Sequence, residues 1–124
     1  MATNTLPHDH GNTGLAENLK KYLDRTEQFS AAAESMSLLA DTSRLRIFWL
    51  LCHCEECVVN ISALTGMSSP AVSHHLRILK EAGILTSRRE GREVYYAAAD
   101  TPACRQLHLA AERLLELESC PAGK

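Results

Sequence analysis

The sequence lacks long apolar segments, has few aromatic residues and carries almost no excess of either charge. Its 124 residues include 13 basic and 15 acidic side chains, a formal net charge of −2, and 5% are aromatic. This balance excludes an acidic disordered tail and a uniformly basic coat, although it allows a local basic face. The apolar run Ile47–Cys52 is far shorter than the roughly 20 residues that span a bilayer. No basic segment followed by an apolar stretch opens the chain, so we expect neither a signal peptide nor membrane association.

Complete disulfide pairing is also excluded, because the chain has five cysteines. Without an export signal, we expect a cytoplasmic protein whose thiols stay reduced. Three of the five fall within six residues, at Cys52, Cys54 and Cys57, with His53 between them. An enzyme has little support, since no phosphate-binding loop and no combination of nucleophile, base and orienting acid is visible.

The length suits one domain with tails. We expect a flexible tail over residues 1–14, one domain over residues 15–118 and a short tail over residues 119–124. Apolar spacing within the domain predicts helices at 15–23, 31–40, 43–51, 60–65, 69–82 and 102–118. Asp41 is expected to cap the third of these helices, and Asn60 the fourth. The apolar positions on the first and last helices exceed what one small domain needs, which predicts a dimer surface on these two helices.

Two of the predicted helices form a helix-turn-helix pattern. Gly66 separates them, and Pro70 marks the start of the second. Residues 84–89 and 92–97 follow with β-like patterns around Gly91, which predicts a hairpin. We therefore expect a mainly α-helical fold with a small β-hairpin, the winged helix-turn-helix.

The second helix of this pair and the hairpin carry groups suited to DNA. Short hydroxyl side chains at a helix N-terminus let the backbone approach the major groove, and arginines at a hairpin tip can reach phosphates or the minor groove. The expected DNA contacts are Ser68, Ser69, Ser73, His74, His75, Arg77, Lys80, Arg88, Arg89 and Arg92. Residues 71–96 hold five basic and three acidic side chains, a net +2 that leaves −4 for the rest. Solvation of a surface is the alternative for these arginines, but the hairpin behind the helix favours DNA binding.

Four segments in order resemble the ArsR/SmtB family of metalloregulators: Asp41–Ile47, Ser69–Leu76, Leu79–Leu85 and Arg89–Tyr96. The resemblance extends over about residues 34–118. It implies a homodimeric repressor that binds double-stranded operator DNA. An inducer would release this repressor and switch on efflux or detoxification genes.

The cysteine cluster predicts a site for a thiophilic ion, because thiolates are the preferred ligands of Cd, Pb, Zn, Cu(I) and As(III). The expected ligands are Cys52, Cys54, Cys57 and Cys120, with Cys104 and His108 as weaker candidates. A role as a small core side chain is an equal alternative for Cys52, and ordinary packing is favoured for Cys104 and His108. Tail residues His8 and His10 are further candidate ligands.

The family's known inducer sites match this chain only in part. Its thiolate sensors commonly read Glu-Leu-Cys-Val-Cys-Asp, where residues 55–60 read Glu-Glu-Cys-Val-Val-Asn, so Cys57 matches and Val59 cannot bind an ion. At the family's C-terminal zinc site, two of the four ligand positions are kept, at Asp100 and Glu116, whereas Pro102 and Arg113 replace histidines. The alternative inducer is an oxidant or reactive sulfur species acting on paired thiols, although Glu55 and Glu56 oppose thiolate formation.

Overall fold

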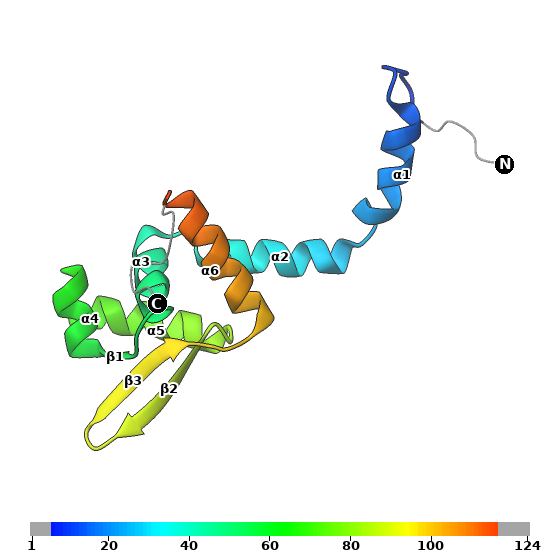
Figure 1. The fold of residues 1–124 in the computed structure, drawn as a ribbon. Coiled ribbons are helices and arrows are strands. Elements are labelled where there is room, and N and C mark those ends of the chain that lie inside the picture. The colour runs from blue at the N-terminus through cyan, green and yellow to red at the C-terminus, as the bar shows by residue number, and fades with distance from the viewer. Residues whose placement is uncertain (1–5, 117–124) are drawn as a thin grey trace. The chain divides into compact units, whose positions relative to one another are not determined.

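The computed structural model describes residues 6–116 and divides the chain into two compact units, residues 1–36 and 37–124. The described part contains six helices and a three-stranded sheet (Figure 1). This confirms the mainly helical fold with a β-hairpin. No helix within residues 6–116 is long and apolar enough to cross a membrane. The predicted division at residues 14 and 118 stays a prediction, and the tail at 119–124 lies outside the described residues.

The first unit holds α1 (Thr13–Leu23) and most of α2 (Thr26–Leu38). Neither helix contains a buried residue. The apolar side chains that predicted α1 are exposed, with Leu15 and Leu23 each at 62%. The predicted second helix at 31–40 in fact begins five residues earlier, at Thr26, and ends at Leu38. These helices therefore do not build a core within one chain.

The second unit begins its ordered packing at α3 (Thr42–Leu51), whose predicted cap is confirmed. The Asp41 carboxylate accepts a hydrogen bond from the backbone N–H of Arg44 at 2.9 Å. This bond is the largest effect on the carboxyl and lowers the pKa of Asp41. The buried residues of α3 are Ile47, Phe48 and Leu51. Leu45 and Trp49 instead line an apolar groove of about 600 Å³ with residues of α4.

The fourth helix, α4 (Val58–Thr65), begins earlier than its sequence predicts. Its N-cap residue is Cys57 rather than Asn60, so the predicted cap was wrong. The Asn60 side chain instead donates a hydrogen bond to Glu56 at 2.8 Å, one turn back along the chain. The strand β1 (Glu56–Cys57) precedes the helix and sets its start. Gly66 then ends α4 in the left-handed region, at φ 77°, which favours glycine.

The helix α5 (Ser69–Glu81) and the hairpin of β2 (Leu85–Glu90) and β3 (Glu93–Ala98) follow the expected order. The strand order is β1-β3-β2, all antiparallel, and Cys57 pairs with Tyr95. Because Glu90 pairs with Glu93, the turn lies at Gly91 and Arg92, one residue later than predicted. The sequence did not predict β1, since a strand of two residues has no readable period.

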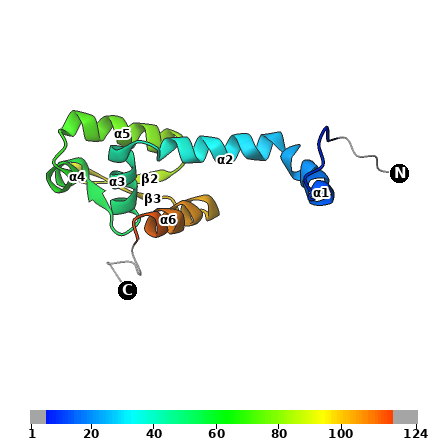
Figure 2. The same cartoon turned by 90° about the horizontal axis from the view of Figure 1, so that it is seen from above.

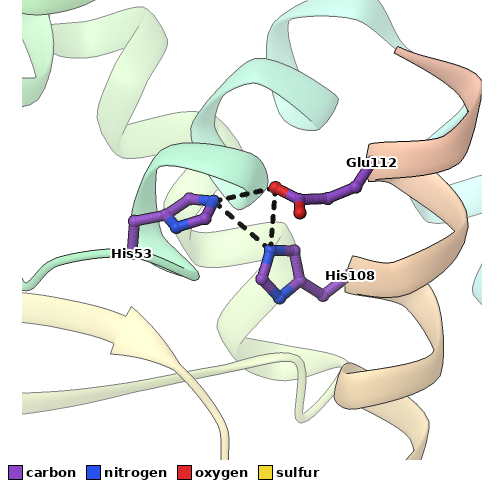
Figure 3. Close-up of side chains that lie close together, drawn as sticks. All are labelled: His53, His108 and Glu112. Carbon is purple, nitrogen blue, oxygen red and sulfur yellow. Dashed lines mark hydrogen bonds and ion pairs between the residues drawn. The ribbon is translucent and has the colours of Figure 1, made fainter. Parts of the chain in front are cut away.

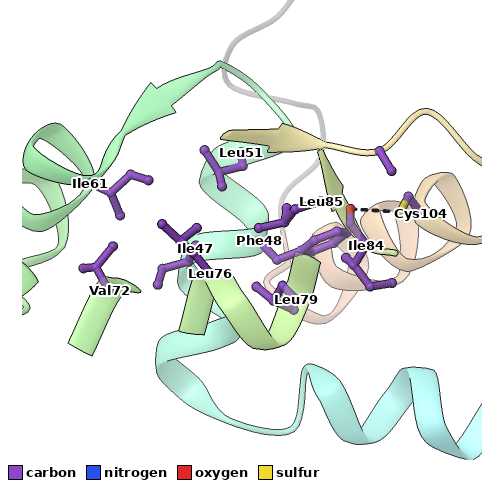
Figure 4. Packing of buried hydrophobic residues seen from close by; sticks show 11 residues of the cluster. Ile47, Phe48, Leu51, Ile61, Val72, Leu76, Leu79, Ile84, Leu85 and Cys104 are labelled. Atoms are coloured by element: carbon purple, nitrogen blue, oxygen red, sulfur yellow. Dashed lines mark hydrogen bonds between the residues drawn. The ribbon is translucent and has the colours of Figure 1, made fainter. Parts of the chain in front are cut away.

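The core of the second unit lies between α3, α5 and the sheet (Figure 4). Val72, Leu76 and Leu79, which recur at helical spacing along α5, are at most 1% exposed. Seen from above, α5 and α6 (Pro102–Leu114) lie on opposite sides of the hairpin (Figure 2). Cys104 and Ala111 are the buried residues of α6. Ala103, Ala110 and Leu114, which also lie on α6, are exposed.

Candidate DNA interface and candidate ligand sites

The face of α5 opposite the core carries the side chains expected to contact DNA. Ser68 caps the helix and accepts a hydrogen bond from Ala71 N–H at 3.2 Å, and Ser69 is exposed in the first turn. Ser73, Arg77 and Lys80 line an open concavity of about 490 Å³ together with Tyr96 of β3. The exposed side of α5 and the wing, which is the hairpin of β2 and β3, thus share one continuous surface.

The two adjacent histidines of α5 differ in environment. His74 is exposed, whereas His75 is half-buried with its Nδ1 3.4 Å from a guanidinium nitrogen of Arg44. Burial lowers the pKa of His75, aided by the charges of Arg44 and His74 and opposed by Asp41. His75 is therefore neutral at pH 7, and His74 is the one of the pair that is open to solvent.

The wing arginines also differ in how they are held. Arg88 donates to the Glu55 carboxylate at 2.8 Å, pairs with Glu90 and lies 4.9 Å from the centre of the Tyr95 ring. Arg89 and Arg92 are exposed, and within residues 6–116 neither forms an ion pair. Arg89 and Arg92 are therefore the wing arginines most accessible to a nucleic acid.

The clustered thiols have three different environments. Cys54 is exposed, Cys52 is half-buried, and Cys57 is buried in β1 at 8% exposure. Burial and the neighbouring Glu56 raise the pKa of the Cys54 thiol. In the described part of the chain, the three sulfurs do not gather within 4.8 Å of one another. A thiolate site made by these three residues stays a prediction.

The remaining predicted ligands lie apart from that cluster. The Cys104 thiol, 3% exposed, donates to the Ile84 carbonyl at 3.3 Å (Figure 4), as expected of a packed core side chain. Cys52, Cys104 and His108 line one cavity of about 200 Å³. The rings of His8 and His10 stack at 5.8 Å in the first unit. Cys120 lies outside the described residues.

A polar cluster that the sequence did not predict joins the turn after α3 to α6. The Nε2 atoms of His53 and His108 and one oxygen of Glu112 face one another (Figure 3). Trp49 donates a hydrogen bond to the same oxygen at 3.0 Å. Within residues 6–116 these three residues are the one group of three or more potential ligands whose atoms lie within 4.8 Å of one another. The four-residue spacing of His108 and Glu112 indicates that they lie on one face of α6. Their contact with His53 depends on the packing of α6 on α3, which the sequence does not show.

Comparison with known proteins gives consistent results. Residues 41–87 match the family model described as the bacterial regulatory protein, arsR family. The chain is 42% identical over 94 residues to the transcriptional repressor SmtB homolog of Synechocystis sp., a match that covers 76% of this chain and 69% of that one. It is 38% identical over 69 residues to the cadmium resistance transcriptional regulatory protein CadC homolog of Staphylococcus aureus, covering 55% and 57%.

A solved structure agrees with both sequence matches. It is the homodimeric winged helix-turn-helix DNA-binding domain of a possible ArsR-family transcriptional regulator from Mycobacterium bovis. It superposes with a TM-score of 0.62 at 31% identity, covering 77% of this chain and 92% of that domain.

Proposed function

This chain belongs to the arsR family of bacterial transcriptional regulators and is not an enzyme. We propose that it is a homodimeric repressor, which a thiophilic metal or metalloid ion releases from its operator. The inducer would be an ion of Cd, Pb, Zn or Cu, or As(III). The genes under the control of the repressor would encode efflux or detoxification proteins. We place the protein in the cytoplasm, where thiols stay reduced. The observation that carries the proposal is the α5 face joined to an arginine-tipped wing.

DNA binding is supported by the distribution of charge on that surface. Arg77 is exposed on α5, and Arg92 lies in the wing turn, so the two can contact a base edge and a phosphate respectively. The N-terminal turn of α5, with Ser69 and Ser73, points its backbone N–H groups toward an approaching phosphate. Acidic side chains border the same surface, since Glu81 lines the concavity of α5 and Glu90 is paired with Arg88.

A homodimer is supported by the apolar faces that no residue of the same unit covers. Leu19 of α1 is 46% exposed and Leu109 of α6 is 50% exposed. Two-fold pairing of such helices buries apolar area and sets the distance between two recognition helices, which must be about one DNA turn.

The ion is proposed to act at the cysteine cluster because of where Cys57 lies. It pairs with Tyr95 of the wing and is the N-cap of α4, the first helix of the helix-turn-helix. A thiolate bond there would pull on both elements that contact DNA. A change of only a few kcal/mol is sufficient, since about 1.4 kcal/mol changes affinity tenfold. Cys52, Cys54 and Cys120 would supply the remaining bonds, and the cadmium-resistance relative supports this class of inducer.

The test is an anaerobic titration of the reduced protein on DNA from upstream of its own gene, followed by fluorescence anisotropy. At least one of Cd(II), Pb(II), Zn(II), Cu(I), Ni(II) and As(III) should release the DNA. In the Cys57→Ser variant, release should require at least about tenfold more ion. If Cys57→Ser is released normally by every ion, the cluster is not the sensor.

A second candidate function has one observation in its favour. Cys52 and Cys104 line the same cavity, so a thiol-based sensor of oxidants or reactive sulfur could use this pair. In the same titration, peroxide or persulfide would then release DNA while metals would not. The Cys104→Ala variant would lose that response, whereas Cys57→Ser would keep it.

A further inference from the structure

The side chains of His53, His108 and Glu112 meet at a single point between two elements (Figure 3). His53 lies in the turn after α3, and the other two lie one turn apart on α6. The Glu112 oxygen is 3.2 Å from His53 Nε2 and 3.3 Å from His108 Nε2, and the two Nε2 atoms are 3.3 Å apart. These three atoms form a nearly equilateral triangle.

This triangle has the dimensions of one face of a tetrahedral metal site. Zinc bonds to histidine nitrogen and carboxylate oxygen are about 2.0–2.1 Å long, which places neighbouring ligands of a tetrahedron roughly 3.3–3.4 Å apart. We propose that His53, His108 and Glu112 form a binding site for a borderline divalent ion such as Zn(II), separate from the cysteine cluster. Two imidazoles and one carboxylate suit such an ion better than the softer thiophilic ions.

The surroundings of the cluster fit a metal site. The side chains are 8%, 28% and 13% exposed for His53, His108 and Glu112, so the ligands are shielded while His108 leaves a path from solvent. Burial raises the pKa of Glu112, but the hydrogen bonds from Trp49 and His108 and the nearby imidazoles outweigh it, and the pKa is lowered overall. The carboxylate is therefore ionised at neutral pH, and Trp49 orients it as outer partners of metal ligands do.

An ion at this site would fasten α6 to the turn that leads from α3 into β1. That turn contains Cys52 and Cys54, so occupancy would also restrict the segment expected to bind thiophilic ions. The site itself needs neither DNA nor the cysteine cluster. Its existence is therefore tested by ion binding alone, and a failed DNA-release experiment would leave it intact.

The position of Trp49 supplies a local signal. It is the one tryptophan of the chain, and its ring lies 4.6 Å from that of His53. Zn(II) added to the chelator-treated, reduced full chain should change tryptophan fluorescence. This change should saturate when one ion is bound by the three residues of each chain. Co(II) bound by these three residues should give the visible absorption of a tetrahedral nitrogen and oxygen site, which is distinct from the thiolate charge-transfer bands of an ion at the cysteine cluster.

The variants His108→Gln and Glu112→Gln should each weaken Zn(II) binding at this site at least about tenfold. Affinity is measured by competition with a chromogenic chelator, because Glu112→Gln also changes the partner of Trp49. His108→Gln leaves the Trp49–Glu112 bond in place, and circular dichroism checks that each variant folds. The matched control Gln106→Ala shortens an exposed polar side chain on the same helix and should leave both the fluorescence change and the affinity unaltered.

Three results would overturn the proposal. One is Zn(II) binding of equal strength in the wild type and in both folded variants. Another is a Co(II) spectrum that shows thiolate charge-transfer bands and no nitrogen and oxygen site. The third is the absence of any tryptophan response to Zn(II) at millimolar concentration, which would make the three residues a hydrogen-bonded cluster only.

Discussion

At the scale of single residues, the same side chain has different consequences in different places. Val72 of α5 is fully buried in the core, whereas Val59 of α4 is 64% exposed. Cysteine shows the same contrast, since Cys104 is a core side chain bonded to the Ile84 carbonyl and Cys54 is open to solvent. Burial, which depends on the fold, decides what each residue contributes to stability or chemistry.

The two valines provide a matched test of the core. Val72→Ala removes two buried methyl groups and leaves a cavity, so we expect a loss of about 2–3 kcal/mol in the free energy of unfolding. Val59→Ala, also in a helix, should change it by less than about 0.5 kcal/mol. Urea denaturation at one fixed protein concentration measures both, because a dimer's stability depends on concentration. Equal effects of the two substitutions would show that the core is not arranged as described.

At the scale of elements, α5 and the wing divide the proposed work on DNA. The polar side of α5 faces away from the core and presents Arg77, while the wing turn presents Arg92. Arg88 lies between them but is held by Glu55 and Glu90, so it stabilises the wing against the segment before β1. The two exposed arginines are therefore expected to act on different parts of the duplex.

Substitution of these arginines separates sequence reading from backbone binding. Arg77→Ala should cost about 1–3 kcal/mol on the operator and reduce discrimination against other sequences. Arg92→Ala should weaken binding to all sequences alike. It should also reduce the slope of the logarithm of the binding constant against the logarithm of the salt concentration by about one. The control is Arg105→Ala on α6, whose side chain is exposed and paired with Asp100. Binding of operator and unrelated DNA over a range of salt measures all three, and a large loss for Arg105→Ala would argue against this interface.

At the scale of the whole molecule, a single chain leaves much apolar surface on its helices. Leu15, Leu23 and Leu114 are each more than half exposed, and no residue of α1 or α2 is buried. Monomeric proteins rarely leave such helices open, so a second copy is the proposed cover. The relative from Mycobacterium bovis, which is homodimeric, supports the same assembly.

Charge placed on these faces should weaken the dimer. Each of Leu19→Lys and Leu109→Lys should raise the dimer dissociation constant by about tenfold or more, because a buried leucine contributes about 1.5–3 kcal/mol. Val59→Lys, at an exposed apolar position on α4, is the control and should have no effect. Analytical ultracentrifugation gives the mass relative to the 13.7 kDa chain. A wild-type chain that is monomeric at micromolar concentration would contradict the proposal.

The helix-turn-helix, the wing and the core positions of α5 can be predicted from the amino-acid sequence, because they depend on local rules. Asp41 caps its helix through a bond to a residue three positions away, and Gly83 follows α5 with φ at 80°. Val72, Leu76 and Leu79 lie on one side of α5 because of the helical period. Short-range geometry of this kind can be predicted from residues that are close in the sequence. The resemblance to the family's motifs predicted in addition that the protein is a dimeric repressor.

The buried faces of α3 and α6, and the side chains that meet across them, depend instead on how the helices pack in three dimensions. Both helices are apolar on more than one side, so their period alone did not distinguish a core face from one lining a groove. The strand β1 exists because residues 56 and 57 pair with β3, far along the chain. His53 and Glu112 meet for the same reason, since their contact depends on how two helices rotate and pack, and no local spacing encodes that rotation.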